Sequence, residues 1–335
     1  MRKALIVAPS WIGDTILAQP LFARLHARHP GLILDAFAPA WAAPVLARMP
    51  EVRRIIPNPF AHGEFNLSGR WRAGRELARE GYDSAIVLPN SWKSALLPFF
   101  AGIPQRIGFR GEARRVLLNR IHRLDAAALP QLAQRYALLA EDMGATSPAP
   151  LAAPHLAVDA ESVRATLATL GLDATRPAVA FCPGAEYGPA KRWPPAHFAE
   201  LARRLAATDF SVWLVGSARD APVGEEIARL SDGACKNLCG RTDLGQAIDL
   251  LSCARLVVSN DSGLMHVAAA LDRPLVALYG SSSMAYTPPL SPRARLVCLG
   301  LDCSPCFERE CPLGHFKCLN DLMPERVLEE IRGMP

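Results

Sequence analysis

The feature that most constrains the fold of this chain is an alternation of short apolar runs with longer amphipathic stretches, which occurs twice along 335 residues. Such alternation is typical of β–α–β units, and therefore of parallel sheets covered by helices. In the first half, strands are expected at residues 3–8, 32–37, 52–56, 84–88 and 106–109, with helices at residues 16–28 and 72–80.

The second half repeats the alternation after a Pro/Ala-rich stretch at residues 147–154, which is typical of an interdomain linker. Here the expected strands are residues 178–182, 211–215, 256–259 and 275–279, and the expected helices are residues 197–207, 223–230, 244–251, from about 263, and 325–331. The sequence thus predicts an α/β protein with Rossmann-like, doubly wound domains at residues 1–150 and 151–335. The last helix is placed in the second domain or packed back on the first. Domains of this kind bind ligands at the carboxyl ends of their strands, here expected to face a gap between the two.

Composition narrows the class of partner. Half of the residues are hydrophobic and 21% are charged, a globular profile, and the net charge is +5. This mild basicity suits an anionic ligand or surface but is too weak to indicate nucleic acid. No apolar run reaches the roughly 18–20 residues that span a bilayer. We interpret the basic-then-apolar residues 1–9 as a first strand rather than a signal peptide, and nine cysteines, an odd number, suit a reducing compartment. The expected location is therefore the cytoplasm.

The loop after the first strand, residues 9–15, leads into a helix and contains Gly13 alone where a dinucleotide fold would have G-x-G-x-x-G. A pyrophosphate cradle is therefore not expected there. Asp14 lies where this helix opens. Position alone favours a helix N-cap, and the alternative is a carboxylate that acts as general base.

A second candidate loop, residues 260–266, follows an apolar strand and opens an apolar helix. The free amides and positive dipole end of that helix suit a diphosphate near Ser262 and Gly263. Asp261 would repel phosphate, so sugar hydroxyls are its more plausible ligands. His266, one turn into the helix, is either a phosphate contact or a buried histidine.

A third candidate loop, residues 183–194, is ordered by glycine and proline and carries adjacent cations at Lys191 and Arg192. A lysine is a good partner for a phosphate that gains negative charge as it leaves, although an exposed basic turn is the ordinary alternative. For a ribose hydroxyl, Asp220 and Glu225 are both candidate acceptors, and the sequence does not decide between them.

Together these segments resemble glycosyltransferase family 9, the ADP-heptose:lipopolysaccharide heptosyltransferases. The segments that carry the resemblance are spread over residues 1–290: 9–14, 38–41, 48–52, 88–95, 101–104, 181–186, 188–194 and 260–271. Residues 89–94 and 184–186 favour the type II enzymes of this family.

The resemblance implies a GT-B fold and inverting transfer of L-glycero-D-manno-heptose from ADP-heptose to the first heptose of the lipopolysaccharide inner core, with no catalytic metal. It implies that Asp14 is the general base, in place of the cap favoured by position. It also implies that Lys191 neutralises the donor diphosphate and that Asp261 holds the heptose. The remaining donor-binding residues that it implies are Glu186, Tyr187, Ser262, Gly263 and His266.

The acceptor would then be a phosphorylated glycolipid at the inner membrane surface, with the enzyme peripheral to it. The first domain offers a set of basic residues around an apolar stretch, namely Lys93, Arg106, Arg110, Arg114, Arg115 and Arg120. We interpret this set as a surface for acceptor phosphates and anionic lipid, although a solvated basic helix face explains any single member equally well. Ser10, Trp11, Lys93 and Arg110 are the candidate acceptor-binding residues.

Four cysteines near the C-terminus, Cys303, Cys306, Cys311 and Cys318, form the pattern C-x2-C-x4-C-x6-C. Four thiols this close can bind a structural zinc ion, although the second pair lacks C-x2-C spacing. The sequence does not decide between structural zinc and free thiols or partial disulfides formed on isolation, and none of these is expected to have a role in catalysis.

Two alternatives remain for the function. Within the family, the chain could be a type I heptosyltransferase or a member with another acceptor. From a different class, it could be a sugar-nucleotide-binding protein without turnover.

Overall fold

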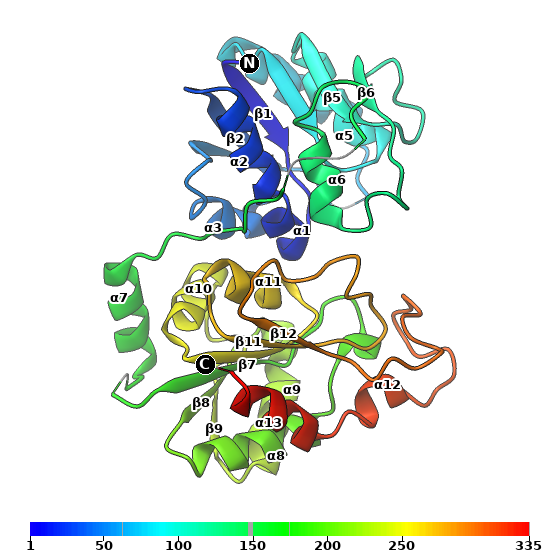
Figure 1. Cartoon of the computed structure of the whole chain (residues 1–335). Coiled ribbons are helices and arrows are strands. Elements are labelled where there is room, and N and C mark those ends of the chain that lie inside the picture. Colours follow the sequence, from blue (N-terminus) through cyan, green and yellow to red (C-terminus); the bar gives the residue numbers. More distant parts are fainter. Residues whose placement is uncertain (62, 147–149, 174, 335) are drawn as a thin grey trace. The chain divides into compact units, whose positions relative to one another are not determined.

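The computed structural model of the chain describes residues 1–61, 63–146, 150–173 and 175–334 (Figure 1). The chain divides into two compact units, Met1–Pro154 and His155–Pro335. The expected boundary at residues 150/151 lies close to this division, and residues 147–149 of the expected linker lie outside the described part. Within the described residues, no helix is both long and apolar enough to cross a membrane.

The first unit is built on a six-stranded sheet of order β3-β2-β1-β4-β5-β6, in which every pair of neighbours is parallel. Its strands are β1 (Lys3–Val7), β2 (Ile33–Ala38), β3 (Arg54–Pro57), β4 (Ser84–Val87), β5 (Gln105–Phe109) and β6 (Arg120–His122). Its helices are α1 (Ile12–Leu17), α2 (Gln19–Arg28), α3 (Ala43–Leu46), α4 (Leu67–Leu77), α5 (Trp92–Phe100) and α6 (Leu132–Leu138).

The second unit repeats this plan, with a six-stranded parallel sheet of order β12-β11-β10-β7-β8-β9. Its strands are β7 (Ala178–Cys182), β8 (Ser211–Leu214), β9 (Cys235–Asn237), β10 (Leu256–Asn260), β11 (Leu275–Leu278) and β12 (Ala294–Val297). Its helices are α7 (Ala160–Leu170), α8 (Pro195–Ala206), α9 (Ala221–Leu230), α10 (Leu244–Cys253), α11 (Gly263–Ala270), α12 (Lys317–Asn320) and α13 (Pro324–Arg332).

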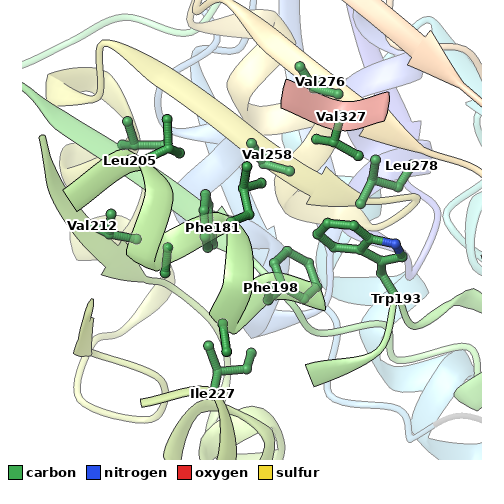
Figure 2. Packing of buried hydrophobic residues seen from close by; sticks show 14 of the residues in the cluster. Phe181, Trp193, Phe198, Leu205, Val212, Ile227, Val258, Val276, Leu278 and Val327 are labelled. Atoms are coloured by element: carbon green, nitrogen blue, oxygen red, sulfur yellow. The ribbon is translucent and has the colours of Figure 1, made fainter. Parts of the chain in front are cut away.

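The central strands form because their apolar runs are buried on both faces, as parallel sheets require. All residues of β7 and β10 are buried, and in the first unit all residues of β4 are. Helices then cover the sheets with apolar faces. Figure 2 shows this core in the second unit, where Phe181, Phe198 and Val258 pack together.

The same strand order in both units defines a place for ligands. In each sheet the order reverses direction between the first and fourth strands of the unit: between β1 and β4, and between β7 and β10. Doubly wound sheets bind ligands outside the carboxyl ends of the strands at such a switch point. The segments after β1, β7 and β10 are the three that the sequence singles out.

The α/β prediction of two doubly wound Rossmann-like domains is confirmed. One predicted element was wrong: the helix expected at residues 16–28 is two helices, α1 and α2, which part at Ala18. Pro20 lies in the first turn of α2, where it has no amide hydrogen to continue the helix from α1. The last helix, α13, packs on α8 and β11 of the second unit, with Val327 in the core.

Candidate functional site

An ion pair between Lys191 and Asp261 forms the centre of the candidate donor site in the second unit. The Lys191 Nζ lies 2.5 Å from the Asp261 Oδ2, and the two side chains are 18% and 5% exposed. Lys191 comes from the loop after β7 and Asp261 directly follows β10, so both lie at the switch point. Because little water screens them, these charges act strongly on any ligand that reaches them.

Buried anchors hold this pair in place. The Trp193 backbone N–H donates to the Asn260 Oδ1 over 3.1 Å, and the Asn260 Nδ2 donates to the Pro183 carbonyl over 2.7 Å. Trp193 itself is buried against Phe198, with ring centroids 4.8 Å apart (Figure 2). Asn260 thus joins both ends of the loop at residues 183–194, which we call the donor loop. Sequence reasoning missed this role, and its only signal was the place of Asn260 at the end of a buried strand.

The N-terminus of α11 lies next to this pair. Ser262 is the N-cap and makes no side-chain cap hydrogen bond, and Ser262 and Gly263 are both partly exposed. The first amides of a helix have no partner within it and carry partial positive charge. Together with Lys191, they form a site suited to a diphosphate.

His266, one turn into α11, is fully enclosed. Its pKa is lowered to about 4, chiefly by burial; Asp261 opposes the shift, and Lys191 adds to it. The ring is therefore neutral near pH 7. Its Nδ1 is buried without a hydrogen-bond partner among the described residues. The sequence left open whether His266 contacts phosphate or is a buried histidine, and its burial in the structure agrees with the second interpretation. Any contact with phosphate would be a hydrogen bond from an uncharged ring.

This burial predicts a loss of stability in acid. Because the pKa of His266 in the folded state lies below its ordinary value of 6.5, the unfolded chain takes up a proton first as the pH falls. The contribution of His266 to stability is therefore complete above pH 6.5 and decreases as the pH falls toward 4. We expect the melting temperature of the wild type to fall more steeply over this interval than that of His266→Gln. Equal slopes in a thermal-shift series would contradict the assignment.

Tyr187 joins the site through its ring. The Lys191 Nζ lies 5.0 Å and the Arg309 Cζ 5.3 Å from its centroid, and its hydroxyl donates to the Phe307 carbonyl over 2.6 Å. Its neighbour Glu186 pairs instead with Arg219, at an exposed position. The structure thus brings Tyr187 to Lys191 and gives Glu186 a different partner.

Asp220 lies against the donor loop, since a Cβ at Gly184 would come within 2.4 Å of its carboxylate. Its Oδ2 accepts hydrogen bonds from the backbone N–H and hydroxyl of Ser217, over 2.9 and 2.8 Å. Glu225 is exposed on α9. Of the two candidate acceptors, Asp220 therefore lies against the donor loop, whereas no contact between Glu225 and that loop is found among the described residues.

In the first unit, Asp14 lies in the first turn of α1, directly after β1. The interpretation of Asp14 as the N-cap is wrong: Trp11 occupies that position, and no side chain caps the helix there. The Asp14 side chain is half-buried, so it is not enclosed in the protein interior. A carboxylate near the positive end of a helix is stabilised in its charged form, the form that accepts a proton.

Ser10 and Trp11 precede this helix at an exposed position. The indole N–H of Trp41 donates to the Ser10 carbonyl over 2.9 Å, which ties the loop after β2 to the loop after β1. Trp11 is 47% and Trp41 54% exposed. Two exposed aromatic side chains, Trp11 from the Asp14 segment and Trp41 from the loop after β2, therefore lie at this end of the sheet and suit contact with a sugar or lipid.

The basic set expected to form an acceptor surface is only partly at the surface. Arg114 is buried and donates to the Pro89 and Phe109 carbonyls, so its assignment to a surface was wrong. Arg106 donates to the Ile103 and Leu117 carbonyls and holds a turn. Arg110 and Arg115 are exposed, Arg120 is partly buried in β6, and the Lys93 Nζ donates to the Gly63 carbonyl over 2.8 Å.

The four C-terminal cysteines meet at one place. Cys303, Cys306, Cys311 and Cys318 line a single small cavity, together with Ala190 of the donor loop. Across the described part of the chain, no group of three or more His, Cys, Asp or Glu side chains is already placed to hold a metal ion.

Comparison with known proteins agrees with this geometry. Residues 70–317 match glycosyltransferase family 9 (heptosyltransferase). The chain is 47% identical to the lipopolysaccharide heptosyltransferase 2 of Escherichia coli K12, over 99% of this chain and 98% of that protein. It is 44% identical to the lipooligosaccharide heptosyltransferase 2 of Haemophilus influenzae, over 98% of each chain.

The solved structure of the E. coli ADP-heptose LPS heptosyltransferase II superposes with a TM-score of 0.89 at 46% identity, over 99% of this chain and 98% of that one. The GT-B prediction for the fold is thereby confirmed. With a family match across most of its length and relatives that align from end to end, this chain is a glycosyltransferase and belongs to glycosyltransferase family 9.

Proposed function

We propose that this chain transfers L-glycero-D-manno-heptose from ADP-heptose to the first heptose of the lipopolysaccharide inner core, with inversion at the anomeric carbon. The observation that carries the proposal is the Lys191–Asp261 pair beside the N-terminus of α11. The chain that contains this pair aligns over 98–99% of its length with relatives named heptosyltransferase 2. Four relatives that are 44–47% identical to this chain are named heptosyltransferase 2, whereas two named heptosyltransferase 1 are 28–30% identical, which supports type II.

The second unit supplies the donor-binding groups in this proposal. Lys191 and the first amides of α11, at Ser262 and Gly263, neutralise the charge that develops on ADP as it leaves. Asp261 accepts hydrogen bonds from heptose hydroxyls, and Tyr187 orients the Lys191 ammonium through its ring. Because protein cations and amides neutralise the diphosphate, the transfer requires no catalytic metal.

The first unit supplies the proton acceptor. In a single displacement the acceptor hydroxyl oxygen forms a bond to the anomeric carbon as the bond from that carbon to the diphosphate oxygen breaks. The hydroxyl proton passes to the Asp14 carboxylate, and ADP leaves with the bonding electron pair. Ser10, Trp11, Lys93 and Arg110 are the proposed acceptor contacts. A glycolipid acceptor places the enzyme at the cytoplasmic face of the inner membrane, as a peripheral protein.

Two purified acceptors, one without heptose and one with a single heptose, test this function. With ADP-heptose as donor, we expect mass spectrometry to show one added heptose on the heptose-bearing acceptor and none on the other. ADP-glucose serves as the matched control donor and should give no product. Transfer to the heptose-free acceptor alone would reject type II in favour of type I. Binding of ADP-heptose without any product would indicate a protein that binds the sugar nucleotide without turnover.

A further inference from the structure

The stretch at residues 303–316, which we call the cysteine loop, is held in place by something other than a hydrophobic core. It contains no helix or strand, and none of its residues is buried. Irregular stretches of this length are uncommon in compact domains and are usually functional. Where burial cannot fix a segment, proteins use a disulfide or a bound metal. The cysteines of this loop form no disulfide, and hydrogen bonds such as that from the Phe307 N–H to the Ser281 carbonyl, over 2.7 Å, tie the loop to its neighbours. Four free thiols in such a segment make a bound metal the candidate for a further support.

The cysteine loop and α12 enclose a cavity of about 20 Å³, which has room for one ion or one water molecule. Cys303, Cys306, Cys311 and Cys318 all line it. Ser281 lines it as well: this residue is 1% exposed, and its hydroxyl is buried without a hydrogen-bond partner among the described residues. A buried hydroxyl without a protein partner is costly, and a polar occupant of the cavity, a water molecule or an ion, would satisfy it.

Backbone amides surround one of the four sulfurs. The Phe316 N–H donates to the Cys311 Sγ over 3.4 Å, and the amides of Leu313, Gly314 and His315 point to the same sulfur. Amide donors that converge on a sulfur stabilise negative charge there. Such hydrogen bonds are the usual outer-shell support of a metal-bound ligand.

The thiols are not yet arranged as ligands, since no three His, Cys, Asp or Glu side chains in the described residues are placed to hold a metal ion. A cysteine sulfur, however, moves by rotation about a single bond, χ1, between staggered positions. Rotation of these four thiols about χ1 is therefore the movement that ligation requires. Sulfur ligands prefer zinc and iron over magnesium or calcium.

The cysteine loop also supports the donor loop. The Phe307 carbonyl accepts the Tyr187 hydroxyl, and the Arg309 carbonyl accepts the Ala190 backbone N–H over 3.0 Å. The contact at Gly188 is close enough to require glycine: a Cβ there would lie 2.4 Å from the Arg309 carbonyl oxygen. Ala190, the residue before Lys191, is part of the cavity wall. The position of the cysteine loop is therefore linked directly to the segment that carries Lys191.

We propose that Cys303, Cys306, Cys311 and Cys318 bind one thiolate-preferring transition-metal ion, Zn²⁺ or Fe²⁺, which clamps the cysteine loop against the donor loop. Each thiol that becomes a ligand releases its proton to solvent, and no oxidation is involved. The ion takes no part in the transfer reaction. The proposal does not depend on which sugar or acceptor the enzyme uses.

Metal content is the primary test. We expect protein purified without chelator, under anaerobic conditions, to contain about one Zn or Fe per chain by plasma mass spectrometry. Replacement by Co²⁺ should give the near-ultraviolet absorption of cobalt–thiolate bonds. Cys306→Ser/Cys311→Ser should lose both signals, whereas Cys253→Ser, which changes a cysteine outside the cavity, should keep them. The proposal would be overturned by wild-type protein that contains no metal and takes up no Co²⁺, or that forms disulfides among the four cysteines. If the double variant does not fold, the measurements on the wild type alone decide.

Calorimetry with ADP tests the clamp. Loss of the metal, by chelation or in the double variant, should weaken ADP binding by about tenfold, the equivalent of one or two hydrogen bonds. Cys253→Ser should bind ADP as the wild type does. Metal loss with unchanged ADP affinity would reject the clamp. These two measurements report metal content and ADP affinity, not heptose transfer. The metal proposal can therefore be rejected while heptose transfer is observed, and it can hold while heptose transfer is not observed.

Discussion

Asp14→Asn should lower kcat for heptose transfer by about 10²–10⁴-fold, the usual contribution of a general base. Asparagine keeps the size of the side chain but cannot take the proton of the acceptor hydroxyl. The substitution is in the first turn of α1, at a half-buried position, so the helix and the unit should remain folded. Steady-state rates at saturating donor and acceptor measure the effect.

A matched variant separates loss of the base from loss of a carboxylate in general. Asp125→Asn changes an exposed aspartate in the same unit and preserves the side-chain oxygen that accepts the Ala127 and Ala128 amides. It should transfer heptose at the wild-type rate. Near wild-type turnover in Asp14→Asn would show that another group accepts the proton.

Lys191→Met should have the second large effect. It removes the Lys191 ammonium, which is the only charged group paired with Asp261 among the described residues. The same ammonium is the cation that we propose binds the donor diphosphate. Loss of one preorganised electrostatic contact of this kind lowers kcat by about 10²–10³-fold. Removing one partner of a buried ion pair also costs about 3–5 kcal/mol of stability, and the partial exposure of Lys191 favours the lower end of that range.

A second substitution separates the two consequences of Lys191→Met. In Lys191→Met/Asp261→Asn no buried charge is left unpaired, so the free energy of unfolding by urea should recover while heptose transfer stays low. Lys236→Met, at an edge strand of the same unit, should leave heptose transfer unchanged, although it loses the hydrogen bonds from its Nζ to the Leu170 and Gly171 carbonyls and is therefore a control for transfer only. Recovery of transfer in the double variant would mean that Lys191 serves only to neutralise Asp261.

The central part of the fold could be predicted from the sequence because its strands are continuous apolar runs. The strands β6, β9 and β12 were not predicted, because each is short and lies at the edge of its sheet. Each also contains a charged residue: Arg120 in β6, Lys236 in β9 and Arg295 in β12. An edge strand is solvated on one side and tolerates such residues. The pattern of apolar residues therefore marks the interior of a sheet better than its limits.

The donor loop and the loop at residues 260–266 could be located from the sequence, because strands followed by small polar turns identify the carboxyl ends of a parallel sheet. The contacts between these two loops could not be predicted. The pairing of Lys191 with Asp261 depends on β7 and β10 being neighbours, and the support from Phe307 depends on a loop with no periodic pattern. The prediction that Arg114 lies at the surface was wrong because backbone carbonyls, those of Pro89 and Phe109, accept hydrogen bonds from its guanidinium in place of water.

The division of roles between Asp14, as proton acceptor, and Lys191, as donor-binding cation, is tested most directly by calorimetric titration of ADP into both variants. Asp14→Asn should bind ADP with the affinity of the wild type, and Lys191→Met should bind it at least about tenfold more weakly, the scale of one lost charge contact. Loss of ADP affinity in Asp14→Asn together with wild-type affinity in Lys191→Met would contradict this assignment.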